Sequence, residues 1–187
     1  AWDIAKNISI NIPGVQHIGT APFTVIYPNG SKLFLLGSDN PDSLRGLALW
    51  GGGQDESAQQ PPSLFTEVIS KCLADHLGYW IWAGTPKGKG NFFKTYQAGL
   101  NNPKDYTVIF KTIDDSIKEE TGEAINNLKQ ALEDDKRLVA IGEMTQEEFD
   151  QEWYCSFEGA IKGAYYAKQI SQARKDGRIK KVPYDPA

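Results

Sequence analysis

Two short runs of bulky apolar residues, with a helix-like segment between them, constrain the fold of this chain most. The runs are residues 47–50 (Leu-Ala-Leu-Trp) and 79–83 (Tyr-Trp-Ile-Trp-Ala), and both have the composition of strands. In residues 63–76, between them, apolar side chains recur three to four positions apart, as in an amphipathic helix. Strands that alternate with helices are typical of a parallel sheet. We therefore predict an α/β layered fold with a mainly parallel sheet.

Local signals predict the remaining elements. Asn29-Gly30 joins the β-prone runs 23–27 and 32–36 and tolerates the positive φ angles of a tight hairpin turn. Thr145 and Glu148 have the spacing of a capping box, which predicts the start of a helix. By pattern we also expect helices at 91–98, 123–134 and 146–153, and a strand at 106–111. Four tryptophans are expected in the core rather than on a base-stacking surface: Trp50, Trp80, Trp82 and Trp153.

Composition excludes several classes of protein. The chain has 187 residues, of which 40% are hydrophobic and 24% charged, as in an ordinary globular domain with an appendage. It contains no apolar run long enough to span a membrane and no secretory signal at its start. The two cysteines, Cys72 and Cys155, argue against a disulfide framework and have no spacing that suggests zinc. A reducing cytoplasm is the expected environment.

The formal charge of −4 is unevenly distributed along the chain. Residues 114–152 contain 13 acids and 4 bases, whereas residues 162–181 contain 7 bases and one acid. A basic stretch can neutralise nucleic-acid phosphates, but it can equally be the solvated face of a helix. The candidate DNA-binding residues are Lys162, Lys168, Arg174, Lys175, Arg178, Lys180 and Lys181.

Candidate chemistry follows the first apolar run. Asp55-Glu56 comes a few residues after it, and in P-loop nucleotidases an acid at a strand end holds Mg²⁺ while a neighbouring carboxylate orients the attacking water. An Asp-Glu pair is also common in ordinary loops. The preceding Gly51-Gly52-Gly53 is unexpected, because a buried strand should carry apolar residues.

The loop after the second run has some features of a phosphate-binding loop. Residues 83–90 (Ala-Gly-Thr-Pro-Lys-Gly-Lys-Gly) would fit the pattern GxxxxGK[ST] only with Gly at Ala83 and Ser or Thr at Gly90. Both positions fail, and the loop follows the acid pair, whereas a phosphate loop normally precedes it. Lys87 and Lys89 can contact phosphate or DNA, or can simply be solvated.

Several segments together resemble the central ATPase region of bacteriophage terminase large subunits, which drive DNA into an empty capsid. These segments are residues 37–46 (GSDNPDSLRG), Asp55-Glu56, 64–69 (LFTEVI), 73–75 (LAD) and 78–88 (GYWIWAGTPKG). Residues 147–153 (EEFDQEW), 155–157 (CSF) and 163–166 (GAYY) are similar to the segment that joins the ATPase to the nuclease in that family. The order and spacing of the motifs, rather than any single one, carry the resemblance.

The resemblance implies a role for each residue of the acid pair and for the loop after the second run. Asp55 would coordinate Mg²⁺ as the acid of the Walker B motif, and Glu56 would activate the attacking water. Gly84-Thr85-Pro86 would be the coupling motif, which senses the γ-phosphate of ATP and passes its loss to the surface that grips DNA.

The resemblance also implies that Arg45 is an arginine finger, which acts on the ATP of a neighbouring subunit. Arg45 lies in a polar, turn-rich segment from which a long side chain can reach outward. The alternative is a surface salt bridge to Asp39 or Asp42.

For the whole chain, the resemblance implies part of a P-loop NTPase-like, three-layer fold in residues 1–113 and a helical linker toward a nuclease domain in residues 114–187. The expected cofactors are ATP and Mg²⁺. The expected partners are double-stranded DNA, the portal protein, the terminase small subunit and further copies in a ring on the procapsid, with no membrane. The site of action would be the cytoplasm of a bacterial host.

We expect the chain to be an internal fragment that lacks ATPase activity alone, because the family's phosphate loop would lie before Ala1 and its first nuclease aspartate beyond Pro186. Two other functions remain open. One is a different helicase-like P-loop nucleotidase, and the other is a non-enzymatic DNA-binding module that uses residues 162–181.

Overall fold

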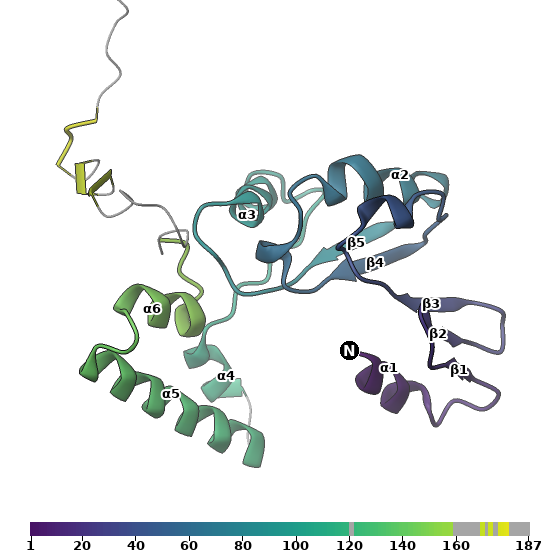
Figure 1. Ribbon diagram of the computed structural model, residues 1–187, viewed down its shortest axis with the longest axis horizontal. Coiled ribbons are helices and arrows are strands. Elements are labelled where there is room, and N and C mark those ends of the chain that lie inside the picture. Colours follow the sequence, from purple (N-terminus) through teal and green to yellow (C-terminus); the bar gives the residue numbers. More distant parts are fainter. Residues whose placement is uncertain (120–121, 159–168, 171, 174–175, 180–187) are drawn as a thin grey trace, which may run out of the picture. The chain divides into compact units, whose positions relative to one another are not determined.

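The computed structural model describes residues 1–119, 122–158, 169–170, 172–173 and 176–179 (Figure 1). The chain divides into two compact units. The first contains residues 1–50 and 61–78, and the second contains residues 51–60 together with the described residues from 79 onward. No described helix combines the length and apolar composition that a membrane span requires.

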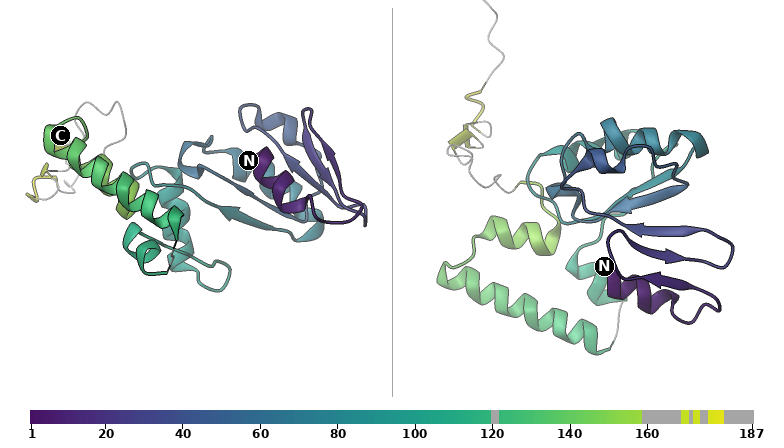
Figure 2. Two further views of the ribbon diagram at one scale, coloured as in Figure 1. Left: turned by 90° about the horizontal axis from the view of Figure 1, so that it is seen from below. Right: turned by 45° about the vertical axis from the view of Figure 1, so that its right-hand side comes forward.

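The first unit contains an antiparallel sheet in the order β1 (Gln16–Ile18), β2 (Phe23–Ile26) and β3 (Lys32–Leu35) (Figure 1). The predicted hairpin is confirmed, and Gly30 has the positive φ that its turn requires (83°). The helix α1 (Trp2–Ser9) packs beside β2, with its Trp2 ring 5.2 Å from that of Phe23 (Figure 2).

Residues 63–76 are mostly helical, but they do not form one regular α-helix. A π-helix, η3 (Leu64–Ile69), leads into the short α2 (Ser70–Cys72), and a 3₁₀ turn, η4 (Ala74–His76), follows. The side chain of Ser63 makes no capping hydrogen bond. These helices pack with η1 (Pro41–Leu44) around a shared set of buried side chains: Leu44, Leu64, Val68, Ile69, Cys72 and Leu73.

The predicted strand at 47–50 is wrong, because the strand β4 begins only after the predicted one ends and spans Gly51–Gln54. The backbone of 47–50 is occupied elsewhere: the Leu49 N–H donates to the carbonyl oxygen of Cys72 at 2.7 Å. The core position predicted for Trp50 is also wrong. Its side chain is 73% exposed and stacks on the His76 ring, with centroids 4.2 Å apart.

In the second unit, β4 pairs in parallel with β5 (Tyr79–Trp82), and the register explains the glycines. Gly51, Gly52 and Gly53 lie opposite Tyr79, Trp80 and Ile81. A Cβ atom at Gly51 would lie 2.5 Å from the Tyr79 ring, and one at Gly52 would lie 2.6 Å from the Trp80 ring. The glycines therefore leave room for the bulky side chains of β5. Besides the backbone pairing, the Trp80 Nε1–H donates to Gln54 Oε1 at 3.2 Å between the two strands.

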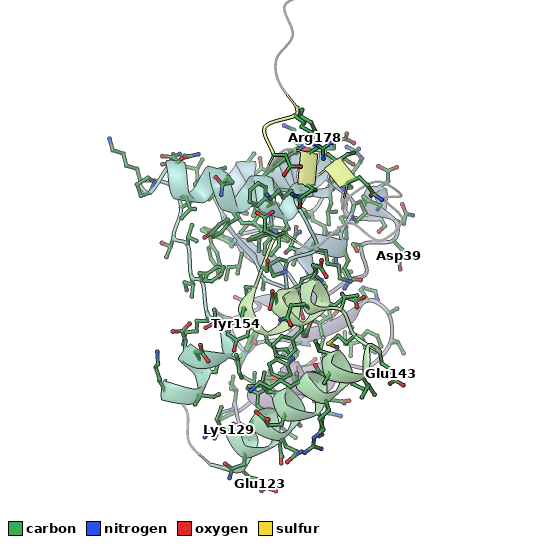
Figure 3. All side chains as sticks on the ribbon, turned by 90° about the vertical axis from the view of Figure 1, so that its left-hand side faces the viewer. Asp39, Glu123, Lys129, Glu143, Tyr154 and Arg178 are labelled. Carbon is green, nitrogen blue, oxygen red and sulfur yellow. The ribbon has the colours of Figure 1, made fainter. Side chains whose placement is uncertain are left out.

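The described part of the second unit also contains the helices η2 (Ser57–Gln59), α3 (Asn91–Asn101), α4 (Ile113–Glu119), α5 (Glu123–Ile141) and α6 (Gln146–Tyr154) (Figure 1). The last three pack around Ile113, Leu132 and Phe149. Figure 3 labels Glu123, the first residue of α5, and Glu143, which lies two residues beyond its end.

The capping box that the sequence predicts for α6 is confirmed. The N–H of Glu148 donates to the Thr145 hydroxyl at 3.1 Å, and the N–H of Thr145 donates to the Glu148 carboxylate at 3.1 Å. The predicted strand at 106–111 is wrong: these residues pair with no strand. Part of this segment lies against α3 instead, where a Cβ atom at Gly99 would meet the Val108 side chain at 2.6 Å.

The α/β class predicted from the sequence is thus confirmed, but the mainly parallel sheet is not, because the larger of the two described sheets is antiparallel. The described residues contain a two-stranded parallel sheet and a three-stranded antiparallel sheet. The three-layer arrangement and the assignment of residues 1–113 and 114–187 to an ATPase and a linker stay predictions.

Candidate active site

The parallel pairing of β4 and β5 brings together the loop that carries Asp55 and Glu56, called the acid turn below, and the loop that begins at Gly84. Gln54 lies opposite Trp82 at the carboxyl ends of the strands. Beyond that pair, the Ala83 N–H donates to the Gln54 carbonyl oxygen at 3.0 Å, and the Ser57 N–H donates to the Ala83 carbonyl oxygen at 2.9 Å. The acid pair and the Gly84 loop are therefore neighbours, although about 28 residues separate them along the chain.

Glu56 has a left-handed backbone conformation (φ 50°, ψ 42°), which is costly for a residue other than glycine. Its N–H donates to Oδ1 of the preceding Asp55 at 2.9 Å. One oxygen of its side chain, Oε2, accepts a hydrogen bond of 2.8 Å from Nε2 of Gln59. Local polar contacts thus hold both the backbone and the carboxylate of Glu56.

Two further side chains fix the turn that carries the acids. Ser57 is buried, and its hydroxyl donates to the Gln54 carbonyl oxygen at 3.0 Å. Gln60 Nε2 donates to the Asp55 carbonyl oxygen at 3.1 Å. Gln60 Oε1 is buried and accepts no hydrogen bond from the described residues, so it is an acceptor open to a small donor such as water. No pattern in the sequence signals these contacts.

The position of Gly84 against the acid turn admits no side chain. A Cβ atom there would lie 2.9 Å from the Ser57 nitrogen and 3.1 Å from Cα of Glu56. Both atoms belong to the backbone, which cannot rotate away. The φ angle of Gly84, 143°, is also one that residues with side chains rarely adopt. A glycine is therefore required at this position for two independent reasons.

The rest of the predicted coupling motif leads into an aromatic cluster. Thr85 is half-buried and Pro86 is buried. Pro86 lines a hollow of about 130 Å³ together with Tyr96, Phe110 and Phe157. The rings of Tyr96 and Phe157 stack with centroids 5.1 Å apart. The loop after β5 thus touches both the acid turn and a cluster that includes α3 and the segment after α6.

Asp55 has the chemistry that a magnesium ligand requires. Its carboxylate is exposed, and Oδ1 accepts the Glu56 N–H, while Oδ2 accepts no hydrogen bond from the described part of the chain. No group of three or more His, Cys, Asp or Glu side chains suited to a metal occurs among the described residues. Mg²⁺ is commonly held by one or two carboxylates, with phosphate oxygens and water as the other ligands, so a single aspartate fits this ion.

Arg45 lies in the first unit, whereas Asp55 and Glu56 belong to the second. Its Nε donates to Oδ1 of Asp42 at 2.6 Å, so the salt bridge named as the alternative to a finger role is formed. This hydrogen bond and the charge of Asp42 raise the pKa of the Arg45 guanidinium above its usual value. Both side chains are more than half exposed, so the ion pair can open at little cost, and the finger role stays a prediction.

Of the candidate DNA-binding residues, only Arg178 lies within the described residues (Figure 3). Its guanidinium pairs with Asp176 at 3.0 Å. The other six lie outside the described residues: Lys162, Lys168, Arg174, Lys175, Lys180 and Lys181. Lys87 is exposed, and the Lys89 ammonium pairs with the Glu158 carboxylate at 2.6 Å.

The resemblance to terminase large subunits is confirmed by comparison with known proteins. The chain is 31% identical over 90 residues to the terminase large subunits of Thermus phage G20c and Thermus virus P23-45. The match covers 48% of this chain and 16% of each relative. No family model matches the chain.

The fold is similar to that of the large terminase ATPase domain of Thermus phage P74-26. The TM-score is 0.57 at 19% identity, and the match covers 83% of this chain and 68% of that domain. A variant of the same domain gives a TM-score of 0.55 at 18% identity, with 84% and 74% of the two chains covered.

Proposed function

We propose that this chain is the part of a bacteriophage terminase large subunit that carries the hydrolytic acids of its ATPase. In the complete protein, the ATPase would couple ATP hydrolysis to the movement of double-stranded DNA into the procapsid. The observation that carries the proposal is the acid turn at the end of β4, packed against Gly84 at the end of β5. The similarity to terminase large subunits over 90 residues supports it.

The two acids would divide the work of hydrolysis. With ATP bound, Asp55 would hold Mg²⁺, which neutralises charge on the phosphate oxygens. Glu56 would accept a hydrogen bond from the attacking water and orient it toward the γ-phosphate. The strained backbone of Glu56 and its contacts to the neighbouring residues suit this role, because a base must stand at a fixed position to be effective.

Gly84-Thr85-Pro86 would respond to the loss of the γ-phosphate. Gly84 lies against the backbone of Glu56, so a shift of the acid turn must move this loop or be resisted by it. Pro86 lies in the aromatic hollow, which gives the movement a route toward α3 and Phe157. The movement that follows the release of phosphate would be transmitted to the DNA-gripping surface by this route.

Further parts of the proposal concern the complete motor. Arg45 would act on the ATP of a neighbouring subunit in a ring on the procapsid, with the portal protein and the terminase small subunit as partners. The basic residues between 162 and 181 would contact DNA phosphates. The motor would work in the cytoplasm of a bacterial host.

The sequence contains no GxxxxGK[ST] motif, so we expect no significant ATP hydrolysis by this chain alone. Steady-state phosphate release by the purified chain tests this. If the chain turns over ATP and Asp55→Ala abolishes this turnover, the chain hydrolyses ATP without such a loop.

The role of Glu56 is tested in the complete protein that contains this chain. Glu56→Gln should reduce ATP hydrolysis by about 10²-fold or more, the usual effect of losing a positioned base. Binding of a fluorescent ATP analogue should persist, because Asp55 is intact. Glu143→Gln, an equal change just beyond α5, is the control and should hydrolyse ATP at the wild-type rate. Near-normal hydrolysis by Glu56→Gln would assign the activation of water to another residue.

A further inference from the structure

Gln59 makes two hydrogen bonds to the acid proposed to activate water. Its backbone N–H donates to the Glu56 carbonyl oxygen at 2.8 Å, and its side-chain Nε2 donates to Glu56 Oε2 at 2.8 Å. Glu56 precedes the 3₁₀ helix η2 and Gln59 is its last residue. The two residues are three positions apart, so one turn of this helix brings their side chains to the same side of it.

The contact to Oε2 matters because the Glu56 side chain is exposed. A free glutamate side chain samples many rotamers, whereas a base must stand at one position relative to the water that it activates. An amide that donates to Oε2 limits this freedom and leaves Oε1 to accept a hydrogen bond from water. Because an amide does not ionise, it provides this donor across the whole working range of pH.

Gln59 is itself held by the turn around it. The buried Ser57, at the start of η2, bonds to Gln54 through its hydroxyl and to Ala83 through its N–H. Gln60 bonds to the Asp55 carbonyl oxygen. The amide of Gln59 thus projects from a backbone that is tied to the ends of both β4 and β5.

We propose that Gln59 is a positioning residue, which orients the Glu56 carboxylate for the activation of water during ATP hydrolysis. This inference rests on the proposed function of Glu56. The contact requires a side-chain donor that is neutral, that is long enough to reach Glu56 Oε2 and that lies on the same turn as Glu56.

Two substitutions of similar length separate a lost donor from lost packing. In the complete protein, Gln59→Met removes the donor and should reduce kcat roughly tenfold, with little change in ATP affinity, because only the orientation of the base is lost. Gln59→Lys restores a donor but adds a positive charge, which makes the Glu56 carboxylate a weaker base, so it should recover only part of the lost kcat. The control is Gln130→Met, which removes an equivalent exposed Gln-to-carboxylate hydrogen bond, to Asp134 on α5, and should leave kcat unchanged.

A double-mutant cycle tests whether Gln59 acts through Glu56. If it does, adding Gln59→Met to Glu56→Gln should cause no further loss of kcat. A further tenfold loss in the double variant would overturn the inference, and so would a Gln59→Met protein with normal kcat.

A wild-type complete protein without ATPase activity would overturn the proposed function, and this inference with it. Active wild-type protein with additive effects of the two substitutions would overturn this inference alone. Thermal unfolding of each variant shows whether a loss of kcat reflects a loss of folded protein.

Discussion

Replacement of Gly84 by alanine tests the packing of the loop after β5 against the acid turn. The new Cβ atom would lie 2.9 Å from the Ser57 nitrogen and 3.1 Å from Cα of Glu56, whereas ordinary contacts are 3.4–4 Å. One of the two loops must therefore move by about half an ångström, and crowding of this kind costs about 1–3 kcal/mol. The φ angle of 143° adds about 1–3 kcal/mol of backbone strain.

A smaller effect acts in the opposite direction. Alanine restricts the unfolded chain more than glycine does, which stabilises the folded protein by about 0.4–1 kcal/mol. The net expectation for Gly84→Ala is a loss on the order of 3 kcal/mol in the free energy of unfolding of this part of the chain. Urea denaturation followed by tryptophan fluorescence would measure it, because Trp80 and Trp82 lie on β5.

Gly90→Ala is the matched control in the same loop. Its Cβ atom would meet only the Lys87 carbonyl oxygen, at 3.9 Å, and its φ of −81° suits any residue. We expect a loss of only about 0.5–1 kcal/mol, because Gly90 is the N-cap of α3 and alanine is a poorer N-cap residue than glycine. Equal denaturation midpoints for Gly84→Ala and wild type would refute the packing argument.

In the complete protein, Gly84→Ala should also lower ATP hydrolysis roughly tenfold. A misplacement of about 1 Å can cost about 10²-fold, and Glu56, the proposed base, would move by about half of that. The same assay on Gly90→Ala should give the wild-type rate. A Gly84→Ala protein that is destabilised but fully active would show that the acid turn stays in place and that the loop moves instead.

Three further predictions concern other parts of the chain. Gly52→Ala places a Cβ atom 2.6 Å from the Trp80 ring, so it should destabilise the protein by about 1–2 kcal/mol in urea denaturation, and adding Trp80→Leu should recover part of the loss. Arg45→Ala in the complete protein should be inactive alone, yet mixing it with Glu56→Gln should restore some ATPase activity. Mixed rings that stay inactive would exclude a role in trans. The pKa of Asp115 is lowered by hydrogen bonds from the N–H and the hydroxyl of Thr112, just before α4. Its contribution to stability is therefore present above the pKa of an unfolded aspartate and is lost as the pH falls through the lower folded value. Thermal unfolding between about pH 5 and 2 should therefore show a smaller acid-induced loss for Asp115→Asn than for wild type.

Elements that depend on local chemistry were predictable from the sequence. The hairpin turn at Asn29-Gly30 and the capping box of Thr145 and Glu148 each need only residues within a few positions of one another. The position of the acid pair beside Gly84 follows from the parallel pairing of β4 and β5, but the side chains of the sequence indicate the first of these strands at 47–50 and not at Gly51–Gln54.

The remaining elements depend on partners far away in the sequence. The glycines of β4 have no preference for a strand, and only the bulk of Tyr79, Trp80 and Ile81 explains them. Residues 47–50 have strand-forming side chains, but the hydrogen bond from Leu49 to Cys72 directs their backbone to a helix end. The contact between Gln59 and Glu56 depends on a 3₁₀ turn that follows a residue in the left-handed conformation. The sequence Gln59-Gln60 does not predict such a turn.

The glycine strand has a consequence for the order in which the protein folds. Three glycines in succession lose more conformational entropy than any other three residues when they become a strand, and β4 has no side chains at these positions to offset that loss. We therefore expect β4 to become ordered only when β5, 28 residues further along in register, is already available to pair with it. The acids that follow β4 would then be among the last residues to reach their native positions, so a chain that is still folding would lack the proposed hydrolytic site.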